Sequence, residues 1–189
     1  RMLPAMADSG IIFRRIDVAG KPELKAFVGN VVDVRRGTTI AQGAAKVYTV
    51  EHVLSAFHAL GVDNAVVEMD GPEPPIADGS AEPYVRMIRK AGIRKLDKPV
   101  RYFSVTKPEM VEESATRIEI HPHDSLKITC KVAFGASPLD AQEFSEEITP
   151  DIFEKSISPA RTFCLYKELE QLIRMGLVKG GSLDNAAVI

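Results

Sequence analysis

The sequence predicts an α+β fold made of two halves, each with several strands and about two helices. Short apolar runs of strand type and amphipathic helical patterns occur in both halves. Near residues 91–99 a glycine, a proline and several charged residues separate these patterns. The length of 189 residues suits one ordinary domain or two small ones. We therefore expect a two-layer α/β sandwich in residues 1–95 and another in residues 96–189.

Strand-like runs open the first half, at residues 11–15 and 26–34. A helix is predicted after Thr49, which is a good N-cap residue. Apolar residues follow Thr49 at the spacing of one helical face as far as residue 60. Gly61 stands where the glycine that ends a helix belongs.

A short apolar strand is predicted at residues 65–69, followed by a loop at 71–75 that contains three prolines. A second helix is expected after Ser80, which can cap it, with Pro83 in its first turn. The apolar positions of this helix are Tyr84, Val85, Met87, Ile88 and Ala91.

In the second half, strands are predicted at residues 100–105, 117–120 and 126–132, the last with strict alternation of apolar and polar residues. Thr149 and Pro150 open a helix that extends to about Ile157. The remaining pattern is a strand, a helix, a glycine turn and a strand. The strand is predicted at residues 160–165 and the helix at 167–175, where Leu169, Leu172 and Ile173 point inward and Gly176 ends the helix. Gly180 and Gly181 form the turn, and the last strand begins at residue 186 and runs to 189.

Composition excludes several classes of protein. The formal net charge of -2 gives no basis for a surface that binds nucleic acid. No apolar run approaches the roughly 20 residues of a membrane helix, so we expect no transmembrane segment. Cys130 and Cys164 match no zinc or redox spacing, and a reducing cytoplasm is the simplest compartment. Residues 1–7 carry no strand signal and the chain ends within an apolar run, so we interpret it as a fragment.

Glu51 and His52 form the sharpest chemical motif, at the start of the first predicted helix. The positive end of the helix dipole would stabilise the Glu51 carboxylate and favour a neutral His52 imidazole, which is the form that binds zinc. An acidic helix start followed by a surface histidine gives the same pattern, and from spacing alone this second interpretation is the more frequent.

Further ligands are not evident from the pattern. His58 points to another face of the helix, and His121 and His123 suit a surface turn between strands better than a metal site. Asp78 and Ser80 could bind a ligand, but closing a turn and capping the next helix is the simpler role. On the strand at residues 160–165, alternation places Arg161 and Phe163 on one face and Thr162 on the other.

These segments occur in the order seen in one enzyme family. The sequence resembles the bacterial zinc-dependent UDP-3-O-acyl-N-acetylglucosamine deacetylases of lipid A synthesis over essentially all of its length. The motifs that carry the resemblance are Ile11-Ile12-Phe13-Arg14-Arg15, Thr38-Thr39-Ile40, Thr49-Val50-Glu51-His52, Gly61-Val62-Asp63-Asn64-Ala65, Pro75-Ile76-Ala77-Asp78-Gly79-Ser80-Ala81, Ala160-Arg161-Thr162-Phe163 and Gly180-Gly181-Ser182-Leu183-Asp184-Asn185-Ala186. Stretches around Arg36, Glu73 and Lys179 resemble the branch that is fused to a hydroxyacyl-acyl-carrier-protein dehydratase.

The resemblance implies two two-layer sandwiches, the second incomplete in this chain, with the active site between them. It implies hydrolysis of the N-acetyl group of UDP-3-O-acyl-N-acetylglucosamine, with zinc as the cofactor. It assigns His52 as a zinc ligand, Glu51 as the general base and Thr162 as a group that stabilises the oxyanion. The substrate-binding residues that it implies are Phe163 at the pocket edge, Phe134 on the uracil, and Leu169, Leu172, Ser182, Ala186 and Val188 along an acyl passage within residues 164–189.

The family pattern also departs from this sequence. Ala133 stands where an acid usually precedes the uracil-stacking aromatic, and two further zinc ligands and a later histidine are expected beyond Ile189. We therefore expect the 189-residue chain by itself to bind zinc weakly and to be inactive. Two alternatives stay open: a non-catalytic or truncated relative without zinc, and a module that binds a nucleotide sugar or an acyl chain with Glu51 and His52 as a structural cap.

Overall fold

A mixed four-stranded sheet organises the first half of the chain. The computed structural model describes residues 1–134, 141–176 and 180–189. The strand order is β1 (Met2–Pro4), β7 (Ala65–Met69), β2 (Ile11–Arg15) and β3 (Glu23–Lys25). The central strands β2 and β7 are parallel, with Phe13 opposite Val67, and the outer pairs are antiparallel.

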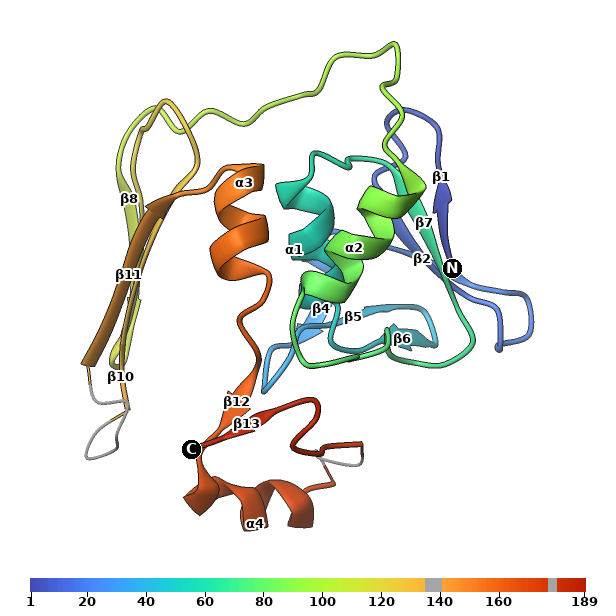
Figure 1. The fold of residues 1–189 in the computed structure, drawn as a ribbon. Helices are drawn as coiled ribbons and strands as arrows, with labels where there is room; N and C mark the ends of the chain where they lie inside the picture. The colour runs from blue at the N-terminus through green and yellow to red at the C-terminus, as the bar shows by residue number, and fades with distance from the viewer. Residues whose placement is uncertain (135–140, 177–179) are drawn as a thin grey trace.

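Two helices, α1 (Glu51–Ala59) and α2 (Glu82–Ala91), lie side by side against this sheet (Figure 1). Because successive side chains on a strand alternate between faces, one face of the sheet is apolar and is buried under the helices. The fully or nearly fully buried residues of this core include Phe13, Leu24, Val67, Val53, Phe57, Val85 and Ile88. The α+β class predicted from the sequence is confirmed by this arrangement.

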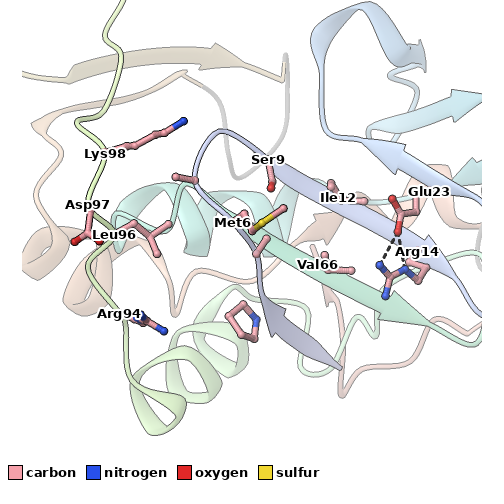
Figure 2. A pocket seen from close by; sticks show the side chains of 13 residues that line it. Met6, Ser9, Ile12, Arg14, Glu23, Val66, Arg94, Leu96, Asp97 and Lys98 are labelled. Atoms are coloured by element: carbon pink, nitrogen blue, oxygen red, sulfur yellow. Dashed lines mark hydrogen bonds and ion pairs between the residues drawn. The ribbon is translucent and has the colours of Figure 1, made fainter.

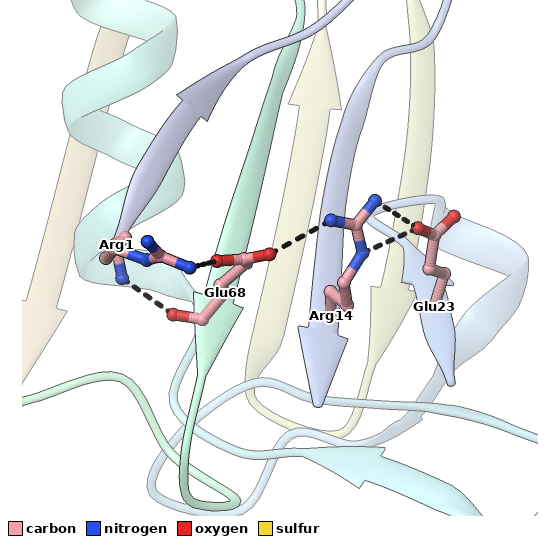
Figure 3. Close-up of polar contacts among 4 residues, drawn as sticks. All are labelled: Arg1, Arg14, Glu23 and Glu68. Atoms are coloured by element: carbon pink, nitrogen blue, oxygen red, sulfur yellow. Dashed lines mark hydrogen bonds and ion pairs between the residues drawn. The ribbon is translucent and has the colours of Figure 1, made fainter. Parts of the chain in front are cut away.

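The opposite face of the sheet carries a row of charges across three strands (Figure 3). Arg1 Nη2 lies 2.6 Å from Glu68 Oε2, and Arg14 Nη1 lies 3.0 Å from Glu68 Oε1. Arg14 Nε also donates to Glu23 Oε1 at 2.8 Å. Hydrogen bonds from Arg14 and Arg1 hold the pKa of the Glu68 carboxyl below its ordinary value. The row is a ladder of alternating charge that pairs residues on neighbouring strands.

The segment after β3 departs from the sequence prediction. A single strand over residues 26–34 was expected, but the chain forms a 3-10 turn, η1 (Val28–Asn30), and then a separate strand, β4 (Val31–Asp33). This strand joins a second small sheet with β5 (Thr39–Gln42) and β6 (Ala45–Val47). The strand β1 was also missed, because it forms through pairing with the distant β7 rather than through its own residue pattern.

The ends of the helices show which capping predictions hold. Thr49 has a left-handed φ of 51° and makes no cap, since α1 begins at Glu51 with Val50 at the N-cap position. Gly61, with φ 69°, ends α1 as predicted. Ser80 was expected to cap α2, but the N-cap residue is Ala81; Ser80 Oγ, one residue earlier, accepts the N–H of Glu82 at 3.2 Å. Met87 was expected among the apolar positions of α2, but its side chain is half exposed.

The region that follows α2 is extended and open. The segment predicted as a strand at residues 100–105 is irregular, and Tyr102 and Phe103 are exposed, because no described strand pairs with it. Two antiparallel hairpins follow, β8 (Glu109–Glu113) with β9 (Thr116–Ile120) and β10 (Lys127–Ala133) with β11 (Ala141–Glu147). The strand predictions at 117–120 and 126–132 are confirmed. Figure 1 shows both hairpins apart from α1 and α2.

The chain then returns to the first half. Thr149 Oγ1 accepts the N–H of Ile152 and caps α3 (Pro150–Ile152), which continues as a π-helical turn, η2 (Phe153–Ile157). This confirms the predicted helix at residues 149–157. Phe153 is only 5% exposed and belongs to the same buried cluster as the core beneath α1 and α2. The helical turn therefore packs on the unit that carries Glu51.

The last described elements form a small strand–helix–strand unit. A short strand, β12 (Phe163–Cys164), precedes α4 (Tyr166–Arg174) and pairs in parallel with β13 (Ala187–Val188). The strand expected at residues 160–165 is thus reduced to two residues. Leu172 is buried as predicted, whereas Ile173 is 59% exposed, so its predicted inward position is wrong. The division into domains at residues 1–95 and 96–189, and the two-sandwich architecture, stay predictions.

No helix within the described ranges is long and apolar enough to cross a membrane.

Candidate active site

Glu51 is the first residue of α1, and its carboxylate is held by the backbone. Glu51 Oε2 accepts the N–H of Thr38 at 2.8 Å, and the side chain is half-buried. The first N–H groups of a helix carry partial positive charge, which stabilises an anion at this position. A hydrogen bond to an ionised acceptor is stronger than a neutral one. The helix start thus favours the ionised carboxylate, and the hydrogen bond from Thr38 orients it.

His52 follows directly and is also half-buried, so an imidazole and a carboxylate stand together at the helix start. Elsewhere, His58 is exposed, His121 contacts Glu119 at 2.8 Å, and His123 contacts Ser125. Within the described ranges no three His, Cys, Asp or Glu side chains gather closely enough to hold a metal ion. A zinc site needs at least three protein ligands. The role of His52 as a zinc ligand therefore stays a prediction.

Thr162 is held between two distant segments by its backbone. Its N–H donates to the carbonyl oxygen of Gly79 at 2.7 Å, and its own carbonyl oxygen accepts the N–H of Ala187 at 2.9 Å. Gly79 has a φ of 84°, and an added Cβ would lie 2.1 Å from the carbonyl oxygen of Asn185. Only glycine therefore fits the close approach that fixes Thr162.

Arg161 joins the same three segments through its guanidinium. Its Nε donates to the carbonyl oxygen of Asp78 at 2.6 Å, and its Nη2 donates to that of Leu183 at 2.9 Å. Burial raises the pKa of the Asp78 carboxyl, but hydrogen bonds from Ser80 outweigh it and bring the pKa below its ordinary value. Asp78 and Ser80 therefore close the turn, as the simpler sequence interpretation expected.

Two residues of this arrangement were not predicted in these roles. Arg161 was assigned only a place on a strand face, and Gly79 was assigned no role at all. A glycine directly after an aspartate and before a helix start was the available signal for Gly79, since this pattern marks positions with positive φ. The partners of Arg161 are backbone carbonyl groups far away in the sequence, so no local pattern indicates them.

Phe134 and Phe163 come together, although a long stretch of sequence separates them. Their ring centroids are 5.4 Å apart, and their planes meet at 86°. This edge-to-face geometry is a preferred arrangement of aromatic rings. Phe134 is half-buried and Phe163 is 38% exposed, so part of each ring remains open to a ligand.

The five residues predicted for an acyl passage all lie in the unit formed by β12, α4 and β13. Leu172 is buried, whereas Leu169, Ala186 and Val188 are half-buried. Val188 pairs with Cys164, and the carbonyl oxygen of Ser182 accepts the N–H groups of Asn185 and Ala186. Lys179, with its two preceding residues, lies outside the described residues.

A surface hollow lies elsewhere, on the outer face of the first sheet (Figure 2). Met6, Ile12, Arg14 and Val66 line it, and the chain that follows α2 borders it through Arg94 to Lys98. None of the predicted site residues is among its lining residues. The predicted site residues, Glu51 and Thr162 among them, therefore lie outside this hollow.

The family model described as LpxC: UDP-3-O-acyl N-acetylglycosamine deacetylase matches residues 1–189. The chain belongs to this family. The resemblance inferred from the sequence motifs is thereby confirmed, including its extent over the whole chain.

Curated relatives of the deacetylase family support the assignment. The chain is 42% identical to a UDP-3-O-acyl-N-acetylglucosamine deacetylase of Anaeromyxobacter sp. (strain Fw109-5), covering 100% of this chain and 61% of the relative. It is 40% identical to the enzyme of that name from Acidithiobacillus ferrooxidans, covering 98% and 62%. The chain thus spans about three-fifths of the length of these relatives.

One relative of the deacetylase family is a fusion protein. The chain is 41% identical to the bifunctional enzyme LpxC/FabZ of Porphyromonas gingivalis, covering 98% of this chain and 40% of the relative. This identity lies between those to the two unfused deacetylases, so it does not separate the fused branch from the rest of the family.

Proposed function

We propose that the protein to which this chain belongs removes the N-acetyl group from UDP-3-O-acyl-N-acetylglucosamine by hydrolysis, in lipid A synthesis. Family membership supports the reaction class. The observation that carries the proposal is the Glu51 carboxylate, fixed by the Thr38 N–H beside His52. A base held in one direction at a helix start suits the abstraction of a proton from water.

In this proposal, Glu51 takes a proton from the attacking water and passes it to the departing amine. The proposal assigns the hydroxyl of Thr162, whose backbone is fixed by Gly79 and Ala187, as a donor to the oxyanion that develops on the carbonyl. His52 supplies one ligand to zinc, and the remaining ligands come from outside the described residues. When bound, zinc supplies polarisation of the amide carbonyl and a lowered pKa of water.

Phe134 and Phe163 would form the wall at the nucleotide end of the substrate, and the unit of β12, α4 and β13 would hold its acyl chain. The fused dehydratase is a proposal for the parent protein alone, prompted by one bifunctional relative. We also place the enzyme in the cytoplasm, where the free thiols Cys130 and Cys164 would stay reduced.

The test uses the complete protein loaded with zinc. Glu51→Gln should lower kcat by about 10²- to 10⁴-fold, the usual contribution of a general base, with zinc content unchanged. Glu82→Gln is the matched control, because Glu82 is likewise the first residue of a helix, α2. Full activity of Glu51→Gln would contradict the role of Glu51 as the general base, whereas an absence of deacetylase activity in the unsubstituted protein would favour a binding module.

The metal assignment has its own pair of variants. His52→Ala should lower the zinc content measured by elemental analysis, whereas His58→Ala, on the same helix, should leave it unchanged. Equal zinc content in both variants would remove His52 from the ligand set.

A further inference from the structure

The loop that holds the Glu51 carboxylate is in close contact with it. Thr38 donates its N–H to Glu51 Oε2, and a Cβ on the neighbouring Gly37 would lie 3.4 Å from Glu51 Oε1 and 3.2 Å from Thr49 Oγ1. The backbone of residues 37–38 therefore lies directly against the carboxylate. A displacement of this loop would change the direction in which Glu51 presents its oxygens.

Arg36 begins this contact segment and has a left-handed φ of 61°. Its guanidinium reaches across to the small unit at the end of the chain, where Nη2 lies 2.7 Å from Glu168 Oε2. Glu168 stands in the first turn of α4, next to Leu169. Among the residues that the structure describes, this is the only ion pair between α4 and the unit that carries α1.

The position of the ion pair indicates what it can do. Arg36 is two residues from the N–H that binds Glu51, and Glu168 is on α4, the helix that carries Leu169 and Leu172. The pair is 48% exposed at Arg36 and 32% exposed at Glu168, so it adds little to the overall stability. Such a contact can still set the relative position of two surface segments.

We propose that Arg36 and Glu168 are positioning residues that link α4 to the loop holding Glu51. This inference rests on the proposed function, because it acts through Glu51. The link makes the placement of the catalytic carboxylate depend on the placement of α4. A substrate whose acyl chain covers the apolar side of α4 would then favour the catalytic position of Glu51, and a substrate with a short acyl chain would favour it less.

The test is a charge exchange in the complete, zinc-loaded enzyme. Arg36→Glu and Glu168→Arg should each lower kcat for a long-chain substrate about two- to fivefold, the range expected for breaking one exposed ion pair. KM should change little. The double variant Arg36→Glu/Glu168→Arg should recover most of the loss, and about 0.5 M salt should shrink the difference between each single variant and the parent.

The control is an ion pair within α4 itself, Arg174 with Glu170, which lies 2.5 Å apart and leaves the first unit untouched. Reversal of these two charges should leave kcat unchanged. If the two losses of kcat add in the double variant, or if the control charge reversals lower kcat as much as Arg36→Glu does, the proposed link is wrong. The proposed function is tested separately, because its failure would appear as an absence of deacetylase activity in the unsubstituted enzyme.

A second readout does not depend on turnover. In the 189-residue chain, which contains no tryptophan, Tyr166→Trp at the exposed start of α4 would be a single fluorescent reporter. Its emission should shift on Arg36→Glu and return in the double variant. An unchanged spectrum in all variants would show that the pair does not hold α4.

Discussion

The ring of Phe134 stands edge-on to the ring of Phe163, with the centroids 5.4 Å apart. A loop that follows β10 and the short strand β12 thus share one aromatic surface. The contact links two residues that we assign to the same substrate.

This pairing predicts coupled losses of substrate affinity. Phe134→Leu and Phe163→Leu in the complete enzyme should each weaken binding of the UDP-sugar about two- to tenfold, since an aromatic pair contributes beyond its buried area. The double variant should lose less than the product of the two. Binding can be measured by calorimetry with an inactive Glu51→Gln background. Phe144→Leu, at a partly exposed phenylalanine on β11, is the control, and strictly multiplicative losses would refute the coupling.

Gly79 predicts a stability effect that is specific to its neighbours. Gly79→Ala places a Cβ 2.1 Å from the carbonyl oxygen of Asn185 at a φ of 84°, so the segment 183–187 must move. Overpacking of this kind costs about 1–3 kcal/mol, and the melting temperature of the 189-residue chain should fall by several degrees. Gly71→Ala meets no atom within 4 Å and should melt like the parent. Equal melting temperatures for Gly79→Ala and Gly71→Ala would contradict the close approach of Gly79 to Asn185.

The charge ladder on the outer sheet face predicts a pH dependence. Hydrogen bonds from Arg14 and Arg1 lower the pKa of Glu68 below its ordinary value of 4.5, so its stabilising contribution is present above that value. The contribution is lost as the pH falls through the lowered pKa. At pH 7, Glu68→Gln should reduce the melting temperature by about 1–4 °C, and the difference from the parent should vanish as the pH falls below the lowered pKa of Glu68.

The control for the pH series is Glu146→Gln, which changes an exposed acid on β11. It should follow the parent at every pH. A Glu68→Gln difference that persists at the acidic end of the series would assign the effect to packing rather than to charge.

Ala186 predicts a preference for acyl-chain length. Ala186→Leu should narrow the space beside β13 and shorten the preferred acyl chain of the complete enzyme. Each methylene that is no longer buried costs about 0.8 kcal/mol, or roughly fourfold in kcat/KM. The measurement compares kcat/KM for long and short substrates, with Ala44→Leu in an exposed turn as the control. Equal losses of kcat/KM for both substrates, together with a lower melting temperature, would indicate that Ala186 is a core residue.

The elements that the sequence predicted well are those whose pattern is local. The strand at Ile11–Arg15, the strand at Ala65–Met69 and the helix end at Gly61 follow from alternation and from the preference of glycine for positive φ. The Thr149 cap of α3 was likewise predicted from a local pattern, the Thr149-Pro150 pair. The order of the motifs along the chain was by itself specific enough to indicate the family.

The elements that the sequence missed depend on distant partners. Met2–Pro4 becomes a strand because β7 offers it hydrogen bonds, and residues 100–105 remain irregular because no described strand does so. Thr49 has a good capping side chain, but its φ of 51° sets the helix start one residue later than a Thr49 cap would allow. Of the candidate site, Glu51 and His52 came from a motif. The Thr38 N–H and the carbonyl partners of Arg161 are backbone groups, which no side-chain pattern reveals.

The burial of Phe153 has a consequence for the order in which this protein folds during synthesis. Its ring fills the core beneath α1 and α2, and deleting a buried phenylalanine side chain costs about 3–5 kcal/mol. The half that carries Glu51 is therefore expected to leave the ribosome with an incomplete core, which Phe153 can fill only after about sixty further residues have emerged. Until then the nascent chain would expose apolar surface, which makes a folding intermediate prone to aggregation.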